Sequence, residues 1–197
     1  TQMVAKGLDF ENVTLVGVLS ADQVLYSDDF RSNERGFDLM TQVVGRSGRG
    51  TKRGRAIIQT YTPENPVIAL ASHQDYVHFY QQEILFRKAM LYPPFADIVV
   101  IGFVGEQESK VAKASQLFLE MLSHLASKEY SELPIRALRP TPAQVAKVSN
   151  KYRYKLMIKC KNNLTFRTML SRLLVACGKE KAFAGVTVYA DSNPDMI

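Results

Sequence analysis

The order of apolar segments between residues 96 and 190 limits most strongly how this chain can fold. The run ADIVVIGFVG is typical of a buried central strand, and YRYKLMIKC and GVTVYA are typical of two more, because β-branched and aromatic residues dominate them. Residues 108–128 and 164–178 instead repeat apolar residues at helical spacing. With IRALRP as a further extended segment, the order is β-α-β-β-α-β. This order predicts a ferredoxin-like (split βαβ) α+β domain.

The first part of the chain has a different pattern. VTLVGVL (13–19) and AIIQTY (56–61) are typical of short buried strands. Between them, residues 34–44 predict a helix with Phe37, Met40 and Val44 on one side. A strand, a helix and a strand indicate a layered α/β unit with too few strands for a complete doubly wound sheet.

A helical stretch begins in TPENPVIALASHQ and reaches about Met90. The following YPPF (92–95) ends it, because neither proline can extend a helix. We therefore expect three segments: an α/β part at 1–62, a helical connector at 63–92 and the α+β domain at 93–197.

Charge separates the two ends of the chain. Residues 1–92 hold ten basic and ten acidic residues, whereas residues 93–197 hold fifteen basic and nine acidic residues, which accounts for the net charge of +6. Such asymmetry favours a polyanionic partner for the second part. The sequence has no apolar run of about 20 residues and no signal-peptide pattern, so we expect a cytoplasmic protein without a membrane partner.

Metal chemistry is not indicated. The two cysteines, Cys160 and Cys177, lack the C-x-x-C spacing of metal sites and lie in apolar-periodic segments, so we expect buried thiols. The three histidines also lack partners at ligand spacing. We therefore expect no metal in this chain.

The stretch TQVVGRSGRG (41–50) places two arginines on a glycine-rich turn behind a predicted helix. A guanidinium group can capture phosphate oxygens in a bidentate way and can stabilise the charge that develops during phosphoryl transfer. The alternative is a solvated basic turn. A phosphate loop is excluded, because Thr51 stands where that motif requires lysine.

The beginning of the chain, TQMVAKGLDF, adds a second motif. Together, T-x5-G-x-D and Q-x2-G-R-x-G-R resemble motifs V and VI of superfamily 2 helicases, which implies the rear part of a RecA-like lobe two. By this resemblance three residues would face ATP and Mg²⁺ and act in catalysis, with Arg49 as the arginine finger: Gln42, Arg46 and Arg49. Gly7 and Asp9 would couple the nucleotide to DNA, and Thr1 and Gln2 would help to hold the DNA.

The resemblance continues through YPPF, RPTPAQVAKVSNKYRYKLMIKC and YADSNPDMI, so that it covers essentially the whole chain. These segments resemble the family of primosomal replication-restart DNA helicases. The family implies an ATP-driven 3′-to-5′ helicase that recognises stalled forks and D-loops and initiates primosome assembly. It also implies a first helicase lobe and a Zn²⁺-binding, cysteine-rich segment, both of which would precede residue 1.

The implied partners are branched and single-stranded DNA, single-stranded-DNA-binding protein, and the primosome proteins that load the replicative helicase, in a bacterial cytoplasm. Without the phosphate-loop lobe, we expect no ATP hydrolysis by this chain alone. The alternative is a non-catalytic DNA-binding or primosome-docking module.

Residues 135–161 contain eight basic residues and no acidic one. Alternation along the strand 152–160 would turn its aromatic and aliphatic residues to the helices and its basic residues to the other face, beside a loop at 140–150. The alternative is a solvated face, because strands often carry lysine for solubility. As DNA-contacting residues we predict Lys147, Lys151, Arg153, Lys155 and Lys159.

Overall fold

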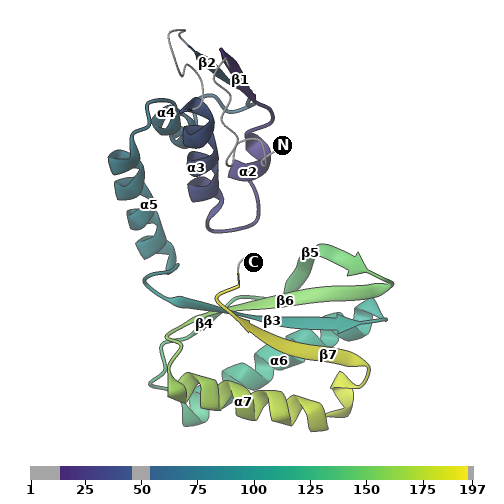
Figure 1. The fold of residues 1–197 in the computed structure, drawn as a ribbon. Coiled ribbons are helices and arrows are strands. Elements are labelled where there is room, and N and C mark those ends of the chain that lie inside the picture. The colour runs from purple at the N-terminus through teal and green to yellow at the C-terminus, as the bar shows by residue number, and fades with distance from the viewer. Residues whose placement is uncertain (1–13, 46–53, 195–197) are drawn as a thin grey trace. The chain divides into compact units, whose positions relative to one another are not determined.

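The computed structural model describes residues 14–45 and 54–194. The chain forms two compact units, residues 1–86 and 87–197, each with its own core (Figure 1). The boundary between the units falls within a helix, between Phe86 and Arg87. The predicted domain limits at 62/63 and 92/93 therefore stay predictions.

The first unit combines two short parallel strands with helices. Its strands are β1 (Leu15–Val18) and β2 (Arg55–Ile58), which pair in parallel. Its helices are α2 (Asp22–Leu25), α3 (Ser32–Val44), α4 (Pro66–Ser72) and the greater part of α5 (Tyr76–Met90). The core lies between the helices, where the rings of Phe37 and Phe79 stack with centroids 4.2 Å apart.

Two predictions for this unit were wrong in detail. On α3, Phe37 and Met40 are buried as predicted, but the buried residue near the C-terminal end is Val43, whereas Val44 is only partly buried. The predicted helix up to Met90 is two helices. Asn65 caps α4 by accepting a hydrogen bond from the Val67 N–H, and Gln74 takes a left-handed φ of 56° between α4 and α5, which ends the helical path.

The second unit contains a five-stranded sheet. Its central strands are β3 (Asp97–Gly105) and β6 (Lys151–Cys160), which pair in antiparallel fashion. β7 (Val186–Ser192) pairs with β3, while β4 (Arg136–Ala137) and β5 (Thr141–Val148) pair with β6. The order along the main path is β4-β6-β3-β7. As predicted, ADIVVIGFVG is a central strand.

Two helices cover one face of this sheet: α6 (Glu108–Glu129) and α7 (Leu164–Lys179), followed by a short 3-10 helix, Lys181–Phe183 (Figure 1). Both helices follow the predicted segments closely. Phe103 of β3 and Phe118 of α6 meet edge to face at 5.5 Å in the core between the layers. We call the opposite side of β6, β3 and β7 the open face.

The two cysteines lie in this core, as predicted. Cys160 and Cys177 are buried as free thiols and form no disulfide. Burial disfavours a thiolate, so it raises the pKa of Cys160 to about 12 and that of Cys177 to about 11. These thiols are therefore poor nucleophiles.

The segment predicted as a loop at 140–150 is largely a strand. β5 forms a hairpin with β6 through Ser149 and Asn150, which both have positive φ, 48° and 61°. Such a two-residue turn matches the right-handed twist of paired strands, and asparagine tolerates it well. The pairing register shifts between Pro142 and Lys147, so the middle of β5 departs from regular ladder geometry.

Candidate nucleic-acid interface

Among the residues predicted from the helicase-like motifs, the structure describes only Gln42. Its side chain is exposed near the C-terminal end of α3, which ends at Val44 before Gly45. Thr1, Gln2, Gly7, Asp9, Arg46 and Arg49 lie outside the described residues. The nucleotide-facing roles of this group therefore stay predictions.

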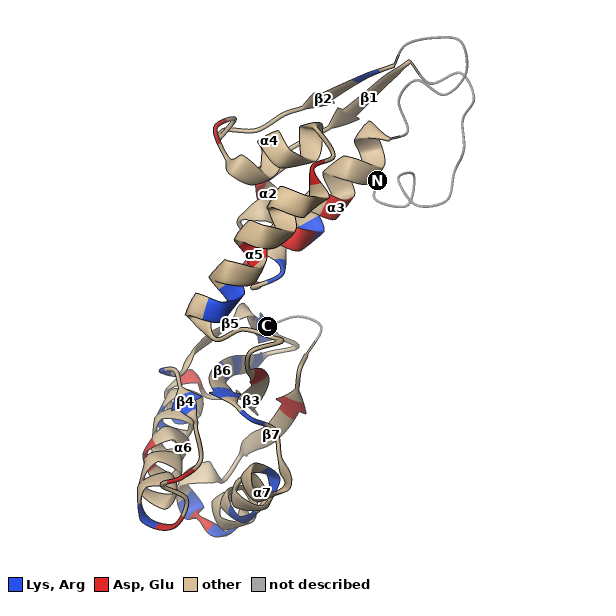
Figure 2. Cartoon of the chain, turned by 90° about the vertical axis from the view of Figure 1, so that its left-hand side faces the viewer, with Lys and Arg blue, Asp and Glu red and all other residues tan. Residues whose placement is uncertain are grey.

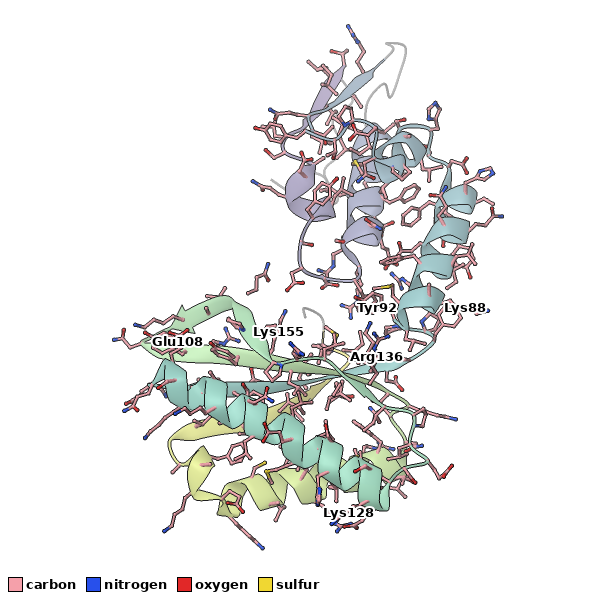
Figure 3. The ribbon with its side chains drawn as sticks, turned by 180° about the vertical axis from the view of Figure 1, so that it is seen from behind. Lys88, Tyr92, Glu108, Lys128, Arg136 and Lys155 are labelled. Atoms are coloured by element: carbon pink, nitrogen blue, oxygen red, sulfur yellow. The ribbon has the colours of Figure 1, made fainter. Side chains whose placement is uncertain are left out.

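The basic residues of β6 lie as alternation predicts. Leu156 and Ile158 are fully buried in the core beneath the helices, and Tyr152 and Tyr154 pack against the same core. Because side chains alternate along a strand, Arg153 and Lys155 point to the open face. Lys151 belongs to the same face, since it also precedes Arg153 by two residues. Figure 3 shows Lys155 on the side of the sheet away from α6. We call Lys151, Arg153 and Lys155 the basic triplet.

The charge around the basic triplet differs from that around the helices. Figure 2 shows basic positions on β6 and a mixture of basic and acidic positions on α6. The helix α6 carries Lys110, Lys113 and Lys128 together with Glu108, Glu120 and Glu129. The helix α6 thus carries as many carboxylates as lysines, whereas no acidic residue interrupts residues 135–161. The basic triplet is the better match for a polyanion.

Lys159 does not fit the prediction that it contacts DNA. The residue is only 6% exposed, its Nζ donates a hydrogen bond to the Met90 carbonyl at 2.6 Å, and the ammonium lies 3.8 Å from the centre of the Tyr92 ring. Desolvation, followed by the nearby charge of Arg136, lowers the pKa of Lys159. Alternation places Lys159 on the predicted face, but its ammonium group is already bound there by the Met90 carbonyl and the Tyr92 ring.

Lys147 has a distinct setting. It pairs in register with Tyr152, whose ring faces the helix side of the sheet, and its Nζ lies 4.7 Å from the centre of that ring and 3.5 Å from the hydroxyl oxygen. The side chain is exposed. Lys147 can still meet a phosphate, but from the tip of the hairpin and not from the open face.

A hollow opens on the open face next to the basic triplet, with a volume of about 230 Å³. The residues that line it come from four strands and include Val100 of β3, Val145 of β5, Arg153 and Lys155 of β6, and Tyr189 and Asp191 of β7. The sequence pattern does not single out Tyr189, because GVTVYA predicts only a core strand. Val188 packs against the core, and successive side chains of a strand point to opposite faces, so alternation places Tyr189 on the open face.

Within the described residues, no cluster of three or more histidine, cysteine or acidic side chains could hold a metal ion. The described helices are also too short or too polar to cross a membrane. The features at hand are thus a basic strand, an aromatic ring and a hollow, on the open face of one sheet.

Comparison with known proteins identifies the relatives of this chain. The family described as primosomal protein N C-terminal domain matches residues 88–194, which is nearly the whole second unit. The chain belongs to the PriA family. It is 40% identical over all 197 residues to replication restart protein PriA of Bacillus subtilis, and covers 24% of that protein.

Two further PriA-family relatives give the same result. The chain is 38% identical over its full length to replication restart protein PriA of Synechocystis, covering 22% of it, and 40% identical over 86% of its length to the PriA protein of Chlamydia muridarum, again covering 22%. The chain therefore spans about a quarter of the length of these relatives.

Proposed function

We propose that this chain is the C-terminal part of an ATP-dependent 3′-to-5′ DNA helicase that recognises stalled forks and D-loops and initiates primosome assembly. Membership of the PriA family and the relatives' name, replication restart protein, support a role in replication restart. The motifs T-x5-G-x-D and Q-x2-G-R-x-G-R support the helicase part.

In this proposal the two units have different tasks. The first is the rear part of a RecA-like lobe, in which Gln42, Arg46 and Arg49 face ATP and Mg²⁺ that are bound mainly by another lobe. Arg49 would stabilise the charge on the transferred phosphoryl group. The second unit is a ferredoxin-like domain whose strand order β4-β6-β3-β7 presents a basic open face to DNA.

The expected partners follow from the same family. They are branched and single-stranded DNA, single-stranded-DNA-binding protein, and the proteins that load the replicative helicase, in the bacterial cytoplasm at replication forks. Zn²⁺ would belong to a cysteine-rich segment elsewhere in a complete family member, since Cys160 and Cys177 are both buried in the core.

The observation that carries the DNA-binding role is the position of the basic triplet on the open face. Such residues contact mainly phosphates, so binding should be weakly sequence-specific and should fall steeply with salt. Replacing Lys151, Arg153 and Lys155 by alanine in the 197-residue chain should flatten the slope of log K against log [salt] by about two to three units, at roughly 0.7–0.9 per phosphate contact.

The matched control removes the same charge from the helix side of the sheet. Lys110, Lys113 and Lys128 of α6 are exposed, and replacing them by alanine should change the slope for forked DNA much less. An equal loss in both triple variants would mean that net charge alone decides binding. Unchanged affinity and slope in the β6 variant would reduce the basic triplet to a solvated face.

The alternative is a module that binds DNA or primosome proteins without any catalytic part. The observation in its favour is that the sequence GRSGRGTK does not match the phosphate-loop motif, because Thr51 precedes Lys52. An ATPase assay distinguishes the two functions: the chain is tested alone and then together with a first helicase lobe supplied from a PriA relative. Stimulated hydrolysis supports the helicase, and continued inactivity supports the binding module.

A further inference from the structure

We propose that the hollow beside Tyr189 accepts an unpaired DNA base, so that the open face is a single-strand binding site and not only a surface for phosphates. This inference rests on the proposed DNA-binding function and specifies the form of DNA that this face recognises.

The backbone of a neighbouring strand supports the Tyr189 ring. Tyr189 pairs in register with Gly102 of β3, and the ring lies so close over this glycine that a Cβ atom added there would overlap it. One side of the ring therefore rests on backbone. The residue nevertheless remains 42% exposed. A ring held against backbone and exposed on its remaining surface is the kind of platform on which a base can stack with little loss of side-chain entropy.

Side chains of opposite charge line the hollow beside the Tyr189 ring. The hollow is lined on the β6 side by Arg153 and Lys155 and on the β7 side by Asp191. A DNA phosphate would be attracted to the β6 side and repelled from Asp191. The backbone of a bound strand should therefore follow β6. A base that turns from there towards Tyr189 can offer its exocyclic amino group to the Asp191 carboxylate.

The size of the hollow favours a base over a single bound water molecule. The hollow is bounded by residues of β5, among them Ala143 and Val145, where the register with β6 is interrupted. Its volume of about 230 Å³ is several times the roughly 30 Å³ that one water molecule occupies in the liquid. In duplex DNA the faces of the bases are covered by their neighbours, so this ring could not stack on them. A single strand exposes those faces, and single-stranded sites commonly pair a basic groove with aromatic platforms.

The experiment compares the 197-residue chain on three fluorescein-labelled oligonucleotides. One is a single strand, the second is the same strand with abasic sites at its centre, and the third is the duplex. All three keep their phosphates, so the difference between the first two isolates the bases. The unmodified chain should bind the normal strand roughly 5- to 100-fold more tightly than the abasic one, as expected for stacking of a base on an aromatic side chain.

Variants then assign the difference to one ring. Tyr189→Leu keeps apolar cover on Gly102 and should bind the normal strand only as well as the abasic strand, with duplex binding unchanged. Tyr189→Phe keeps the ring and should retain the preference for the normal strand. Tyr80→Leu is the control, because Tyr80 is an exposed aromatic residue of α5 and should have no effect.

The outcomes separate this inference from the proposed function. Equal binding of normal and abasic strands by the unmodified chain overturns the stacking site, while a steep salt dependence would leave phosphate binding intact. A preference for the normal strand that survives in Tyr189→Leu also overturns it. Absence of binding to all three oligonucleotides overturns both. The comparison on the unmodified chain needs no variant, so it holds even where a substitution disturbs folding.

Discussion

The two units of this chain cover their sheets in opposite ways. In the first, β1 and β2 form a two-stranded parallel sheet in which Leu15 and Ile57 remain 59% and 53% exposed among the described residues. In the second, α6 and α7 cover the apolar face of a five-stranded sheet completely enough that Ile101, Leu156 and Ile158 are fully buried. The open face of the second sheet instead carries the basic triplet and Tyr189, all at least partly exposed, and its exposed large aliphatic residues, Val145 and Val148, lie on the edge strand β5.

The difference shows what each unit requires from its surroundings. Parallel sheets in globular proteins are normally buried on both faces, so exposed aliphatic residues on β1 and β2 call for further apolar cover. A face that carries arginine, lysine and tyrosine is compatible with water and complementary to an anion. We therefore expect the first unit to depend on other protein segments, and the second to stand alone and to bind DNA.

One substitution in each core tests whether the two cores unfold independently. Phe118→Ala should lower the free energy of unfolding of the second unit by about 3–5 kcal/mol, because Phe118 is fully buried between sheet and helices. Phe37→Ala should act in the same direction on the first unit, where Phe37 stacks on Phe79. Hydrogen exchange read separately in each unit is the measurement.

Each variant is the control for the other. We expect faster exchange only in the unit that carries the substitution, and generally faster exchange in β1 and β2 than in β3 and β6 of the unmodified chain. Loss of protection in both units from either single substitution would show one cooperative structure instead of two independent cores.

The second prediction is that basic residues act in catalysis in the first unit and in DNA affinity in the second. In a full-length PriA protein that carries this chain, Arg49→Ala should lower the kcat of DNA-stimulated ATP hydrolysis by about a hundredfold or more, because an arginine finger acts mainly in the transition state. Nucleotide affinity should remain nearly unchanged. Steady-state kinetics with nucleotide binding measured in parallel tests this.

Arg46→Ala is the informative companion, since we expect part of its loss as weaker ATP binding. Arg35→Ala serves as a control on α3, because Arg35 pairs with Asp29 within the first unit at 3.1 Å. A kcat that Arg49→Ala leaves unchanged would remove the arginine-finger assignment. The basic triplet of the second unit should behave differently and change affinity and salt dependence.

The third effect is a dependence on alkaline pH that the buried thiols should confer on the second unit alone. The pKa values of Cys160 and Cys177 rise to about 12 and about 11 on folding, so the unfolded chain loses these protons first, from about pH 8.5 upward. The contribution of these thiols to the free energy of unfolding is therefore fully present below about pH 8.5. It is lost as the pH rises towards 11, by at most about 1.4 kcal/mol per pH unit for each thiol.

Urea titrations at several pH values, followed through amide resonances of each unit, measure this slope. The first unit contains no cysteine, so it provides an internal reference. Replacing both cysteines by alanine should flatten the pH dependence of the second unit whatever its effect on stability at neutral pH. A slope that persists in the double variant would assign the effect to other groups.

The sequence predicted the elements of the second unit well because their side chains divide sharply between core and solvent. In α7, for example, Phe166, Met169 and Leu173 recur at helical spacing and are all buried. The strand β5 was missed for the opposite reason. Its residues are almost all exposed, so no apolar alternation marks it, and its existence depends on pairing with β6.

The sequence predicted which face of β6 carries the basic residues, but not the contacts that each of them makes. Alternation along β6 gave the face on which Arg153 and Lys155 lie, since that depends only on strand geometry. It could not show that Met90 and Tyr92 contact the Lys159 ammonium, because those residues are far from Lys159 in the sequence. The platform at Tyr189 was missed for the same reason, since its support comes from Gly102 on another strand.

The fit between Gly102 and Tyr189 restricts how this pair of positions can vary in evolution. A side chain at position 102 would occupy the space of the ring at position 189, so neither position can change freely while the other stays the same. Family members with a larger residue at the first position should carry a smaller one at the second. Where the tyrosine is kept, the glycine should be kept with it, and the pair should be inherited as one unit.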